Sequence, residues 1–468
     1  MTLLSLSGTS LLVLLLGMTL LVGFGAHWLF RRFRVPDVLW LIALGVVAGP
    51  LFGLLAPSTL LGIAPLLGTT ALVLILFDAG LDLRVALVRP LVGSALIFAV
   101  TTYVAATVII FAVSDLVLVP GHVVLSLLFA TALGPTSGAV VIPLANALGL
   151  EPGLRSVVQL DSAVEDAISI VVVTTLLTLV TSTSSSLLAL NLTTALILPL
   201  PVGILVGLAA GLVWFLFLYE WQDLPFAALA TLGFLFVVYA ITEALGGSGI
   251  FMAIVFGVMI GNAGMFRRFL RRWRPFHISE DLRKVEVELA FVLRAFFLFL
   301  VGALVTLVAP TLVTAIVIVA LVVALYYVRR LTFRAVTNPR KIPVSWGPPV
   351  AALYGRGLTS AVLLILGAET FPEIARLFLP AILIIVGTNV VMTVGIFTRR
   401  PRPAVTDGEL ERRWADLDPG WLTLASDDGR LIEGTRTSSA PTIPTPTNPK
   451  PSPSHEPPSR PPLPKSGR

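Results

Sequence analysis

The chain has 468 residues, of which 56% are hydrophobic and 12% are charged, whereas soluble domains carry about 25% charged residues. This composition excludes an ordinary soluble domain, and the absence of cysteine excludes disulfides, thiol catalysis and cysteine metal sites. The net charge of +6 does not indicate binding to nucleic acid, because the basic residues cluster at the ends of apolar segments, as membrane topology predicts.

Apolar segments follow one another down most of the chain, at the length that crosses a bilayer. The first is too long for a signal peptide and is followed by the basic stretch RRFR rather than a cleavage site, so we expect it to remain as a helix. At roughly 20 residues per crossing, the pattern predicts about thirteen transmembrane helices. Their expected limits are residues 8–30, 37–56, 64–83, 87–113, 119–147, 154–181, 188–218, 224–244, 247–264, 286–307, 311–335, 348–367 and 372–397.

Basic residues alternate between the loops that join these segments. Loops after odd-numbered segments hold RRFR, RRFLRRWR, NPRK and RRPR, whereas the opposite loops, with VPGH, STSSS and GGSG, hold almost no Lys or Arg. Cytoplasmic loops carry the excess of Lys and Arg. We therefore expect a multi-pass protein of the cell membrane with its N-terminus outside and its C-terminal tail in the cytoplasm.

The composition changes near residue 400. We expect residues 1–400 to form the membrane domain and residues 401–434 to form a short polar cytoplasmic segment. Residues 435–468 are rich in Pro, Ser and Thr. They cannot bury a core, so the sequence predicts a disordered tail.

The sixth predicted segment contains LDSAVEDAISIVV, with three acids among apolar residues. On a helix, Asp161, Ser162, Glu165 and Asp166 fall on one face, about 140° wide. An acid at the centre of a bilayer costs roughly 2.5–3.5 kcal/mol on insertion scales, so this face should meet protein or water rather than lipid. Three acids exceed what helix packing requires, and clustered oxygen ligands suit a monovalent cation or a proton.

Two segments are interrupted near the middle. The fifth contains Pro135 and Pro143 in PTSGAVVIPL, and the twelfth contains Arg356 between two glycines in YGRGLTSAV. Proline removes helical hydrogen bonds, and transporters place ion sites at such broken helices. The twelfth segment comes seven segments after the fifth. Because seven is an odd number, the two segments cross the membrane in opposite directions, which indicates an inverted repeat whose broken helices cross at mid-membrane.

Six motifs in this order resemble those of the monovalent cation/proton antiporters, in the NhaP-like (sodium/hydrogen exchanger) branch. The resemblance covers about residues 10–400 and is carried by VPDVLWLIALGVVAGP, FDAGLDL, PTSGAVVIPL, LDSAVEDAISIV, YYVRRLTF and YGRGLTSAV.

The resemblance implies an all-α polytopic membrane protein with the NhaA/NapA-like antiporter fold, acting as a homodimer in pH homeostasis. It implies a secondary antiporter that exchanges Na⁺, or else Li⁺ or K⁺, for protons, and neither an enzyme nor a protein with a cofactor. The two ions compete at intramembrane carboxylates, and predicted segments 4–6 and 11–13 move against the rest to give alternating access.

The resemblance also assigns site residues. Asp166 takes the place of the ion-binding aspartate, with Asp161 and Ser162 beside it and Thr136 in the broken helix. The implied monovalent cation site therefore consists of Asp166, Asp161, Ser162 and Thr136.

A structural ion pair is implied between Asp78 of the third segment and Arg329 of the eleventh. Because Arg330 follows directly, the buried arginine of this pair is either Arg329 or Arg330.

Two positions depart from the family pattern. Ser137 stands where NhaP-like proteins have an aspartate. Glu165 stands where they have asparagine and where the other branch has an aspartate. Glu165 is therefore a second proton carrier, a protonated spacer or the partner of a nearby arginine, and the carrier is the role we prefer.

Other candidates have plainer interpretations. Arg294, near the end of the tenth segment, could pair with an inner acid, but such a residue more often reaches the membrane interface. His277 could belong to a cytoplasmic pH sensor, although a solvated charged surface is the commoner role.

Two other functions compete with an antiporter. An intramembrane aspartyl enzyme would use two facing aspartates, but the chain has neither of the two motifs of that family. A K⁺-efflux or channel-like transporter is closer, but such systems usually carry a nucleotide-binding domain, and residues 400–468 show no Gly-rich motif for one.

Overall fold

The structure is a computed structural model of the chain. The chain divides into two units, residues 1–428 and 429–468, and every described residue lies in the first. His277 and the predicted segments 401–434 and 435–468 lie outside the described residues. The structure describes residues 8–33, 35–53, 57–83, 85, 91–147, 150, 152–181, 198–221, 226–262, 280–305, 311–336 and 346–397.

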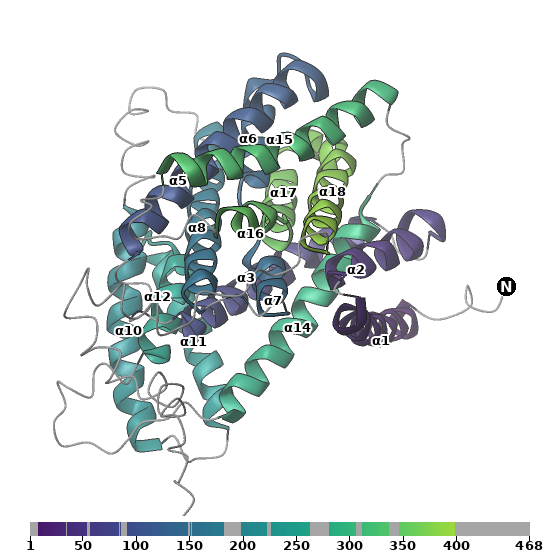
Figure 1. The fold of residues 1–468 in the computed structure, drawn as a ribbon. Helices are drawn as coiled ribbons and strands as arrows, with labels where there is room; N and C mark the ends of the chain where they lie inside the picture. Colours follow the sequence, from purple (N-terminus) through teal and green to yellow (C-terminus); the bar gives the residue numbers. More distant parts are fainter. Residues whose placement is uncertain are drawn as a thin grey trace, which may run out of the picture. The chain divides into compact units, whose positions relative to one another are not determined.

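The described residues form helices and turns, without a β-strand among them (Figure 1). The helices are α1 (Gly8–Phe33), α2 (Asp37–Val46) with the π-helix η2 (Val47–Leu51), α3 (Pro57–Asp82), α5 (Val92–Val113) with the π-helix η3 (Ser114–Leu118), α6 (Val123–Leu133), α7 (Gly138–Ala147), α8 (Pro152–Thr181), α10 (Pro199–Trp221), α11 (Ala227–Ala244), α12 (Gly249–Gly261), α14 (Glu280–Ala303), α15 (Leu312–Val336), α16 (Gly347–Ala352), α17 (Leu358–Thr370), the 3₁₀-helix η6 (Pro372–Leu377) and α18 (Phe378–Phe397).

Each predicted apolar segment contains at least one of these helices. In the described part of the chain, seven helical stretches are long and apolar enough to cross a membrane, and four shorter apolar helices accompany them. The all-helical membrane architecture expected from composition is therefore confirmed.

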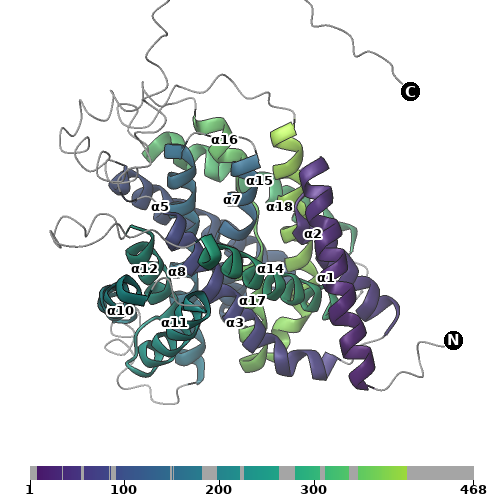
Figure 2. The ribbon, with the colours of Figure 1, turned by 90° about the horizontal axis from the view of Figure 1, so that it is seen from below.

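Helices α3, α10, α11 and α12 pack around a common apolar core, and Figures 1 and 2 both show α10, α11 and α12 side by side. The rings of Phe77 and Phe256 stack there with their centroids 5.2 Å apart. Gly80 of α3 and Gly257 of α12 let the two backbones touch, since a Cβ at either position would overlap a carbonyl oxygen of the other helix. Small residues allow such close approach between membrane helices.

A second close seam joins α2 and α14. A Cβ on Gly45 of α2 would overlap the carbonyl oxygen of Phe299, and a Cβ on Gly302 of α14 would overlap that of Ile42. The α2–α14 seam is therefore another place where two backbones touch.

The two interrupted segments cross, as the sequence predicts. α6 ends at Leu133 and α7 begins at Gly138, whereas α16 ends at Ala352 and α17 begins at Leu358. The backbone N–H of Ser137, in the first gap, donates to the carbonyl oxygen of Gly355, in the second, at 2.9 Å. Each interruption thus supplies a hydrogen-bond partner for the other, and α17 packs against both α6 and α8.

The glycine contacts between α3 and α12 can be tested by adding one methyl group. Gly80→Ala should lower the thermal unfolding temperature in detergent, because overpacking typically costs about 1–3 kcal/mol. Gly233→Ala in α11 is the matched control, since nothing lies within 4 Å of a Cβ there. Equal unfolding temperatures for the two variants would show that α3 and α12 are not in backbone contact.

Candidate functional site

Arg329 of α15 is the central cation of the site, with 1% of its surface exposed. Its Nη2 donates to Oδ2 of Asp161 on α8. Its Nε donates to the carbonyl oxygen of Val350 at 3.0 Å and its Nη1 to Oγ1 of Thr136 at 3.1 Å. The guanidinium also lies over the ring of Phe98, 5.1 Å from its centroid. One side chain thus joins α5, α8, α15, α16 and the gap between α6 and α7.

Glu165 is the second acid facing Arg329. Its Oε1 lies 3.6 Å from Nη1 of Arg329, and its Oε2 accepts a hydrogen bond from the backbone N–H of Thr136 at 2.7 Å. Asp161 lies one helical turn before Glu165 on α8, so the same arginine compensates both charges. A buried charge is tolerated when it is paired and hydrogen-bonded in this way.

Arg356, in the gap between α16 and α17, binds the end of α6. Its guanidinium donates to the carbonyl oxygens of Leu133 and Gly134, and its own backbone carbonyl accepts from the side-chain amide of Asn389 at 2.7 Å. The last carbonyls of a helix lack helical partners and carry negative partial charge. Arg356 satisfies two of them where α6 is interrupted.

Asp166, the third acid of α8, has different surroundings. The hydroxyl of Thr359 on α17 and the backbone N–H of Gly138 are its hydrogen-bonding neighbours. One carboxylate oxygen has no hydrogen-bond partner, and the same is true of the buried hydroxyls of Ser162 and Ser137. Asp161 and Glu165 also keep one such oxygen each. What differs is that these two acids face Arg329, whereas Asp166 faces a hydroxyl and a backbone N–H.

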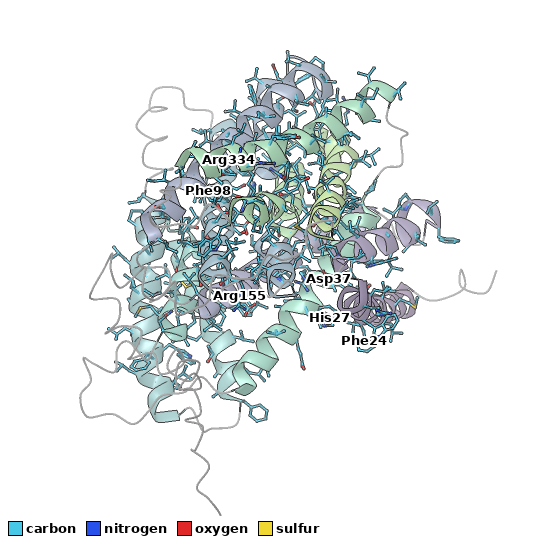
Figure 3. The ribbon with its side chains drawn as sticks, viewed as in Figure 1. Phe24, His27, Asp37, Phe98, Arg155 and Arg334 are labelled. Carbon is cyan, nitrogen blue, oxygen red and sulfur yellow. The ribbon has the colours of Figure 1, made fainter. Side chains whose placement is uncertain are left out.

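A cavity of about 770 Å³ reaches Asp166. Its walls come from α1, α2, α3, α7, α8 and α14, and Figure 3 labels three of its lining residues, Phe24, His27 and Asp37. Its other polar and charged lining residues are Asp78, Gln159, Asp166, Glu288 and Arg294. The cavity, whose lining mixes these groups with apolar side chains, thus reaches one acid of α8.

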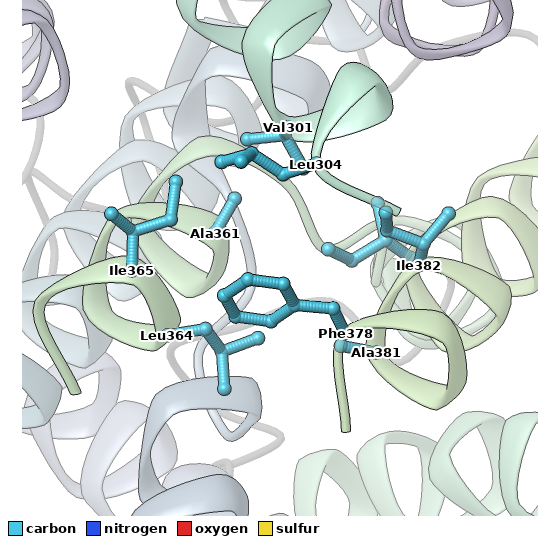
Figure 4. Close-up of a pocket in the computed structure, with 9 residues that line it drawn as sticks. Val301, Leu304, Ala361, Leu364, Ile365, Phe378, Ala381 and Ile382 are labelled. Atoms are coloured by element: carbon cyan, nitrogen blue, oxygen red, sulfur yellow. The ribbon is translucent and has the colours of Figure 1, made fainter. Parts of the chain in front are cut away.

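A second, smaller cavity lies where the end of α14 meets α17 and α18 (Figure 4). Its volume is about 10 Å³, and its nine lining residues, among them Val301, Leu364 and Phe378, are all apolar. It offers no polar partner to a water or an ion.

The predicted pairing of Asp78 with Arg329 is wrong. The acidic partners of Arg329 are Asp161 and Glu165, and Asp78 instead lines the cavity on α3. Arg329 lies at the crossing of the interrupted helices, where two acids on consecutive turns of α8 already surround it. The choice between the two consecutive arginines is resolved, because Arg329 is buried and Arg330 is only partly so.

Arg294 forms an ion pair with an acid, which is one of the two roles that the sequence left open for it. Its Nη2 lies 2.8 Å from Oδ2 of Asp37, with 15% and 14% of the two side chains exposed. Sequence reasoning did not select Asp37, although it stands directly after Pro36 at the start of α2, where an acid favours a helix N-terminus. Gln159 was also missed; it reaches from α8 to the carbonyl oxygen of Ala79 at 2.6 Å.

The predicted ligands of a cation are thus divided. Thr136 donates its backbone N–H to Glu165 and accepts from Arg329 with its hydroxyl, and Oδ2 of Asp161 accepts from the same arginine. One oxygen of Asp166, the hydroxyl of Ser162 and the second oxygen of Asp161 have no hydrogen-bond partner. Among the described residues, no three His, Cys, Asp or Glu side chains converge as metal ligands do. A cation bound at Asp166 would therefore need hydroxyl and carbonyl oxygens, the kind of oxygens that replace the hydration shell of K⁺ in channels.

Apolar helices with two interrupted members crossing beside buried charges have the architecture of a secondary transporter. A family model described as sodium/hydrogen exchanger, transmembrane, matches residues 16–399. The chain therefore belongs to the sodium/hydrogen exchanger family, whose members are transporters, so the aspartyl-enzyme alternative is wrong.

Curated relatives are antiporters of the same family. The K⁺/H⁺ antiporter NhaP2 of Shewanella oneidensis is 28% identical over 236 residues, 49% of this chain and 40% of that protein. The K⁺/H⁺ antiporter NhaP of Alkalimonas amylolytica is 27% identical over 263 residues, 54% of this chain and 44% of that protein. The match spans less than half the length of either relative.

The fold agrees with a solved structure, the sodium proton antiporter MjNhaP1 from Methanocaldococcus jannaschii at pH 8. The TM-score is 0.70 over 83% of this chain and 100% of that one, at 18% identity. At this identity the likeness establishes the fold, and the antiporter fold expected from the sequence is confirmed.

The Arg329 network can be tested with a double-mutant cycle. Arg329→Ala should lower thermal stability in detergent by about 3–5 kcal/mol, because it leaves Asp161 buried without its cation. The double variant with Asp161→Ala should lose less than the sum of the single losses. Arg330→Ala is the matched control. If the stability losses of Arg329→Ala and Asp161→Ala were additive, or if Arg329 were coupled to Asp78 instead, the contact between Arg329 and Asp161 would be contradicted.

Proposed function

We propose that this chain exchanges a monovalent cation for protons, and that Asp166 is the carboxylate for which the two ions compete. The observation that carries the proposal is the division of the acids on α8. Arg329 engages Asp161 and Glu165, whereas Asp166 lines the cavity. Each of the three acids keeps one oxygen without a hydrogen-bond partner, so contact with the cavity is what distinguishes Asp166. Among these three acids, it is the one that an ion in the cavity can reach.

Competition at one carboxylate makes the exchange obligatory. Asp166 holds either a proton or a partly dehydrated cation, because protonation removes the charge that attracts the cation. The hydroxyl of Thr359 and the backbone N–H of Gly138 contact the same carboxylate, and the side chain of Ser162 lies against Gly138. We assign the hydroxyl oxygens of Thr359, Ser162 and Ser137 to the cation as ligands beside Asp166, with the backbone carbonyl of Thr136 contributing from the interrupted helix.

Movement of one group of helices would then expose Asp166 to the other side. We assign α5–α8 and α15–α18 to the moving group, in which Arg329 ties the two halves together, and we assign α1–α3 and α10–α14 to the static group. The cavity walls are helix ends that the distribution of Arg and Lys predicts to be cytoplasmic. The described conformation therefore corresponds to access from the cytoplasm, in a cell-membrane protein with its N-terminus outside and acting as a homodimer.

The identity of the cation is part of the proposal. The resemblance of the motifs favours Na⁺, with Li⁺ or K⁺ as alternatives, and the solved neighbour is a sodium proton antiporter. The two curated relatives named above are K⁺/H⁺ antiporters. We retain Na⁺ as the first candidate and K⁺ as the second, and a flux assay with each ion decides between them.

Asp166→Asn should abolish exchange, because it keeps the shape of the side chain and removes its charge. The measurement is proton flux in proteoliposomes on addition of Na⁺, Li⁺ or K⁺, with the membrane potential clamped. Glu373→Gln, an exposed acid on η6, is the matched control and should exchange normally. Exchange by Asp166→Asn at more than a few per cent of the unmodified rate would remove Asp166 from the mechanism.

For Glu165, the surrounding contacts favour one of the three roles left open by the sequence, that of partner to a nearby arginine. Its contacts with the N–H of Thr136 and with Arg329 support a bracing role.

Glu165→Gln should therefore keep exchange, and its flux should respond to an imposed membrane potential as the unmodified protein does. The measurement compares flux at several clamped potentials. Loss of the potential dependence in Glu165→Gln, with exchange retained, would make Glu165 a second proton carrier.

A further inference from the structure

The interrupted segment contains a carbonyl that its own helix cannot satisfy. In an α-helix, the carbonyl oxygen of residue 139 accepts from the backbone N–H of residue 143. Residue 143 is Pro143, which lies inside α7 and has no N–H. The carbonyl of Ala139 therefore needs a donor from elsewhere, because an unsatisfied carbonyl is costly in an apolar environment.

Arg294 of α14 provides that donor. Its Nη1 donates to the carbonyl oxygen of Ala139 at 3.2 Å, and its Nη2 donates to Oδ2 of Asp37 at 2.8 Å. The other oxygen of Asp37 accepts from the backbone N–H of Val38 at 3.0 Å, so the start of α2 orients the carboxylate. One planar guanidinium thus joins α2, α14 and α7.

The linked carbonyl lies next to the proposed ion site. Ala139 follows Gly138, whose N–H faces Asp166, and Ser137, whose N–H bonds the other interrupted helix. Arg294, Asp37, Ala139 and Pro143 all line the cavity that leads to Asp166. A link at this point holds the first turn of α7 against the wall formed by α2 and α14.

We propose that Arg294 is a latch that stabilises the cavity-open conformation, by holding the carbonyl freed by Pro143 to the α2–α14 seam through Asp37. This inference rests on the proposed function in one respect, since the latch spans the helices assigned to the moving group and those assigned to the static group. The latch must release when α7 moves. Arg294 is a positioning residue, because it acts through α7 rather than on the ion.

The absence of native cysteine permits a test that requires no ion flux. Ala163 lines the cavity on α8, so a thiol at Ala163→Cys reacts with a membrane-impermeant maleimide while the cavity is open. Arg294→Gln in this background should slow the reaction about three- to tenfold, the range expected when the open state loses the net contribution of one typical intramolecular hydrogen bond. Arg294→Lys should give a smaller effect, because a single ammonium cannot reproduce the planar two-armed contact.

A second variant tests the origin of the latch. Pro143→Ala restores the N–H that the carbonyl of Ala139 lacks, so it should slow labelling as Arg294→Gln does. The double variant should be no slower than either single variant, because each removes the same link. Pro65→Ala, which removes a helix-internal proline from α3, and Glu288→Gln, an exposed acid in the cavity wall, are the matched controls and should label at the unmodified rate.

The outcomes separate the latch from the proposed function. Unchanged or faster labelling in both Arg294→Gln and Pro143→Ala, or additive slowing in the double variant, would overturn the latch whatever the flux assays give. Retained exchange in Asp166→Asn would overturn the role of Asp166, while the labelling comparison would still decide whether the latch exists.

Discussion

A backbone carbonyl released from its helix in an apolar environment must find another donor, and this constraint organises the centre of the molecule. Interrupting two helices releases several such carbonyls at once. Three arginines donate to carbonyls at these interruptions. Arg356 bonds Leu133 and Gly134, Arg294 bonds Ala139, and Arg329 bonds Val350, which also accepts from the N–H of Leu353. The interruptions therefore determine where positive charge must be buried.

Buried arginines in turn determine which acids remain available. Arg329 requires carboxylates to balance its charge, and two acids on consecutive turns of α8 supply them. Arg356 lies at the C-terminal end of α6, where the helix dipole favours a cation. Arg294 is balanced by Asp37. Asp166 is then the acid of α8 that faces the cavity, so the backbone of the interrupted helices and the chemistry of the site form one arrangement.

Sequence reasoning found the elements of this arrangement but not all of their partners. The polar face of α8 follows from helical periodicity, and the interruptions follow from Pro135, Pro143 and the glycines beside Arg356, because these signals are local. The partner of Arg329 is 168 residues away in the chain. Two acids predicted within apolar segments were equally plausible partners by charge alone, and only the crossing of α15 over α8 selects Asp161 over Asp78. Asp37 was overlooked because an acid at a helix start has a sufficient local explanation.

The α2–α14 seam limits how the cavity can change shape. Where Gly45 and Gly302 bring the two backbones into contact, neither helix can approach further, and a shift along the seam would drive one backbone into the other. This wall behaves as a fixed frame, so widening or narrowing of the cavity must come from its other walls, among them α7 and α8. Natural substitutions that change the rate of the conformational change should therefore accumulate where α7 and α8 meet this frame. The seam itself should accept only glycine or other small residues.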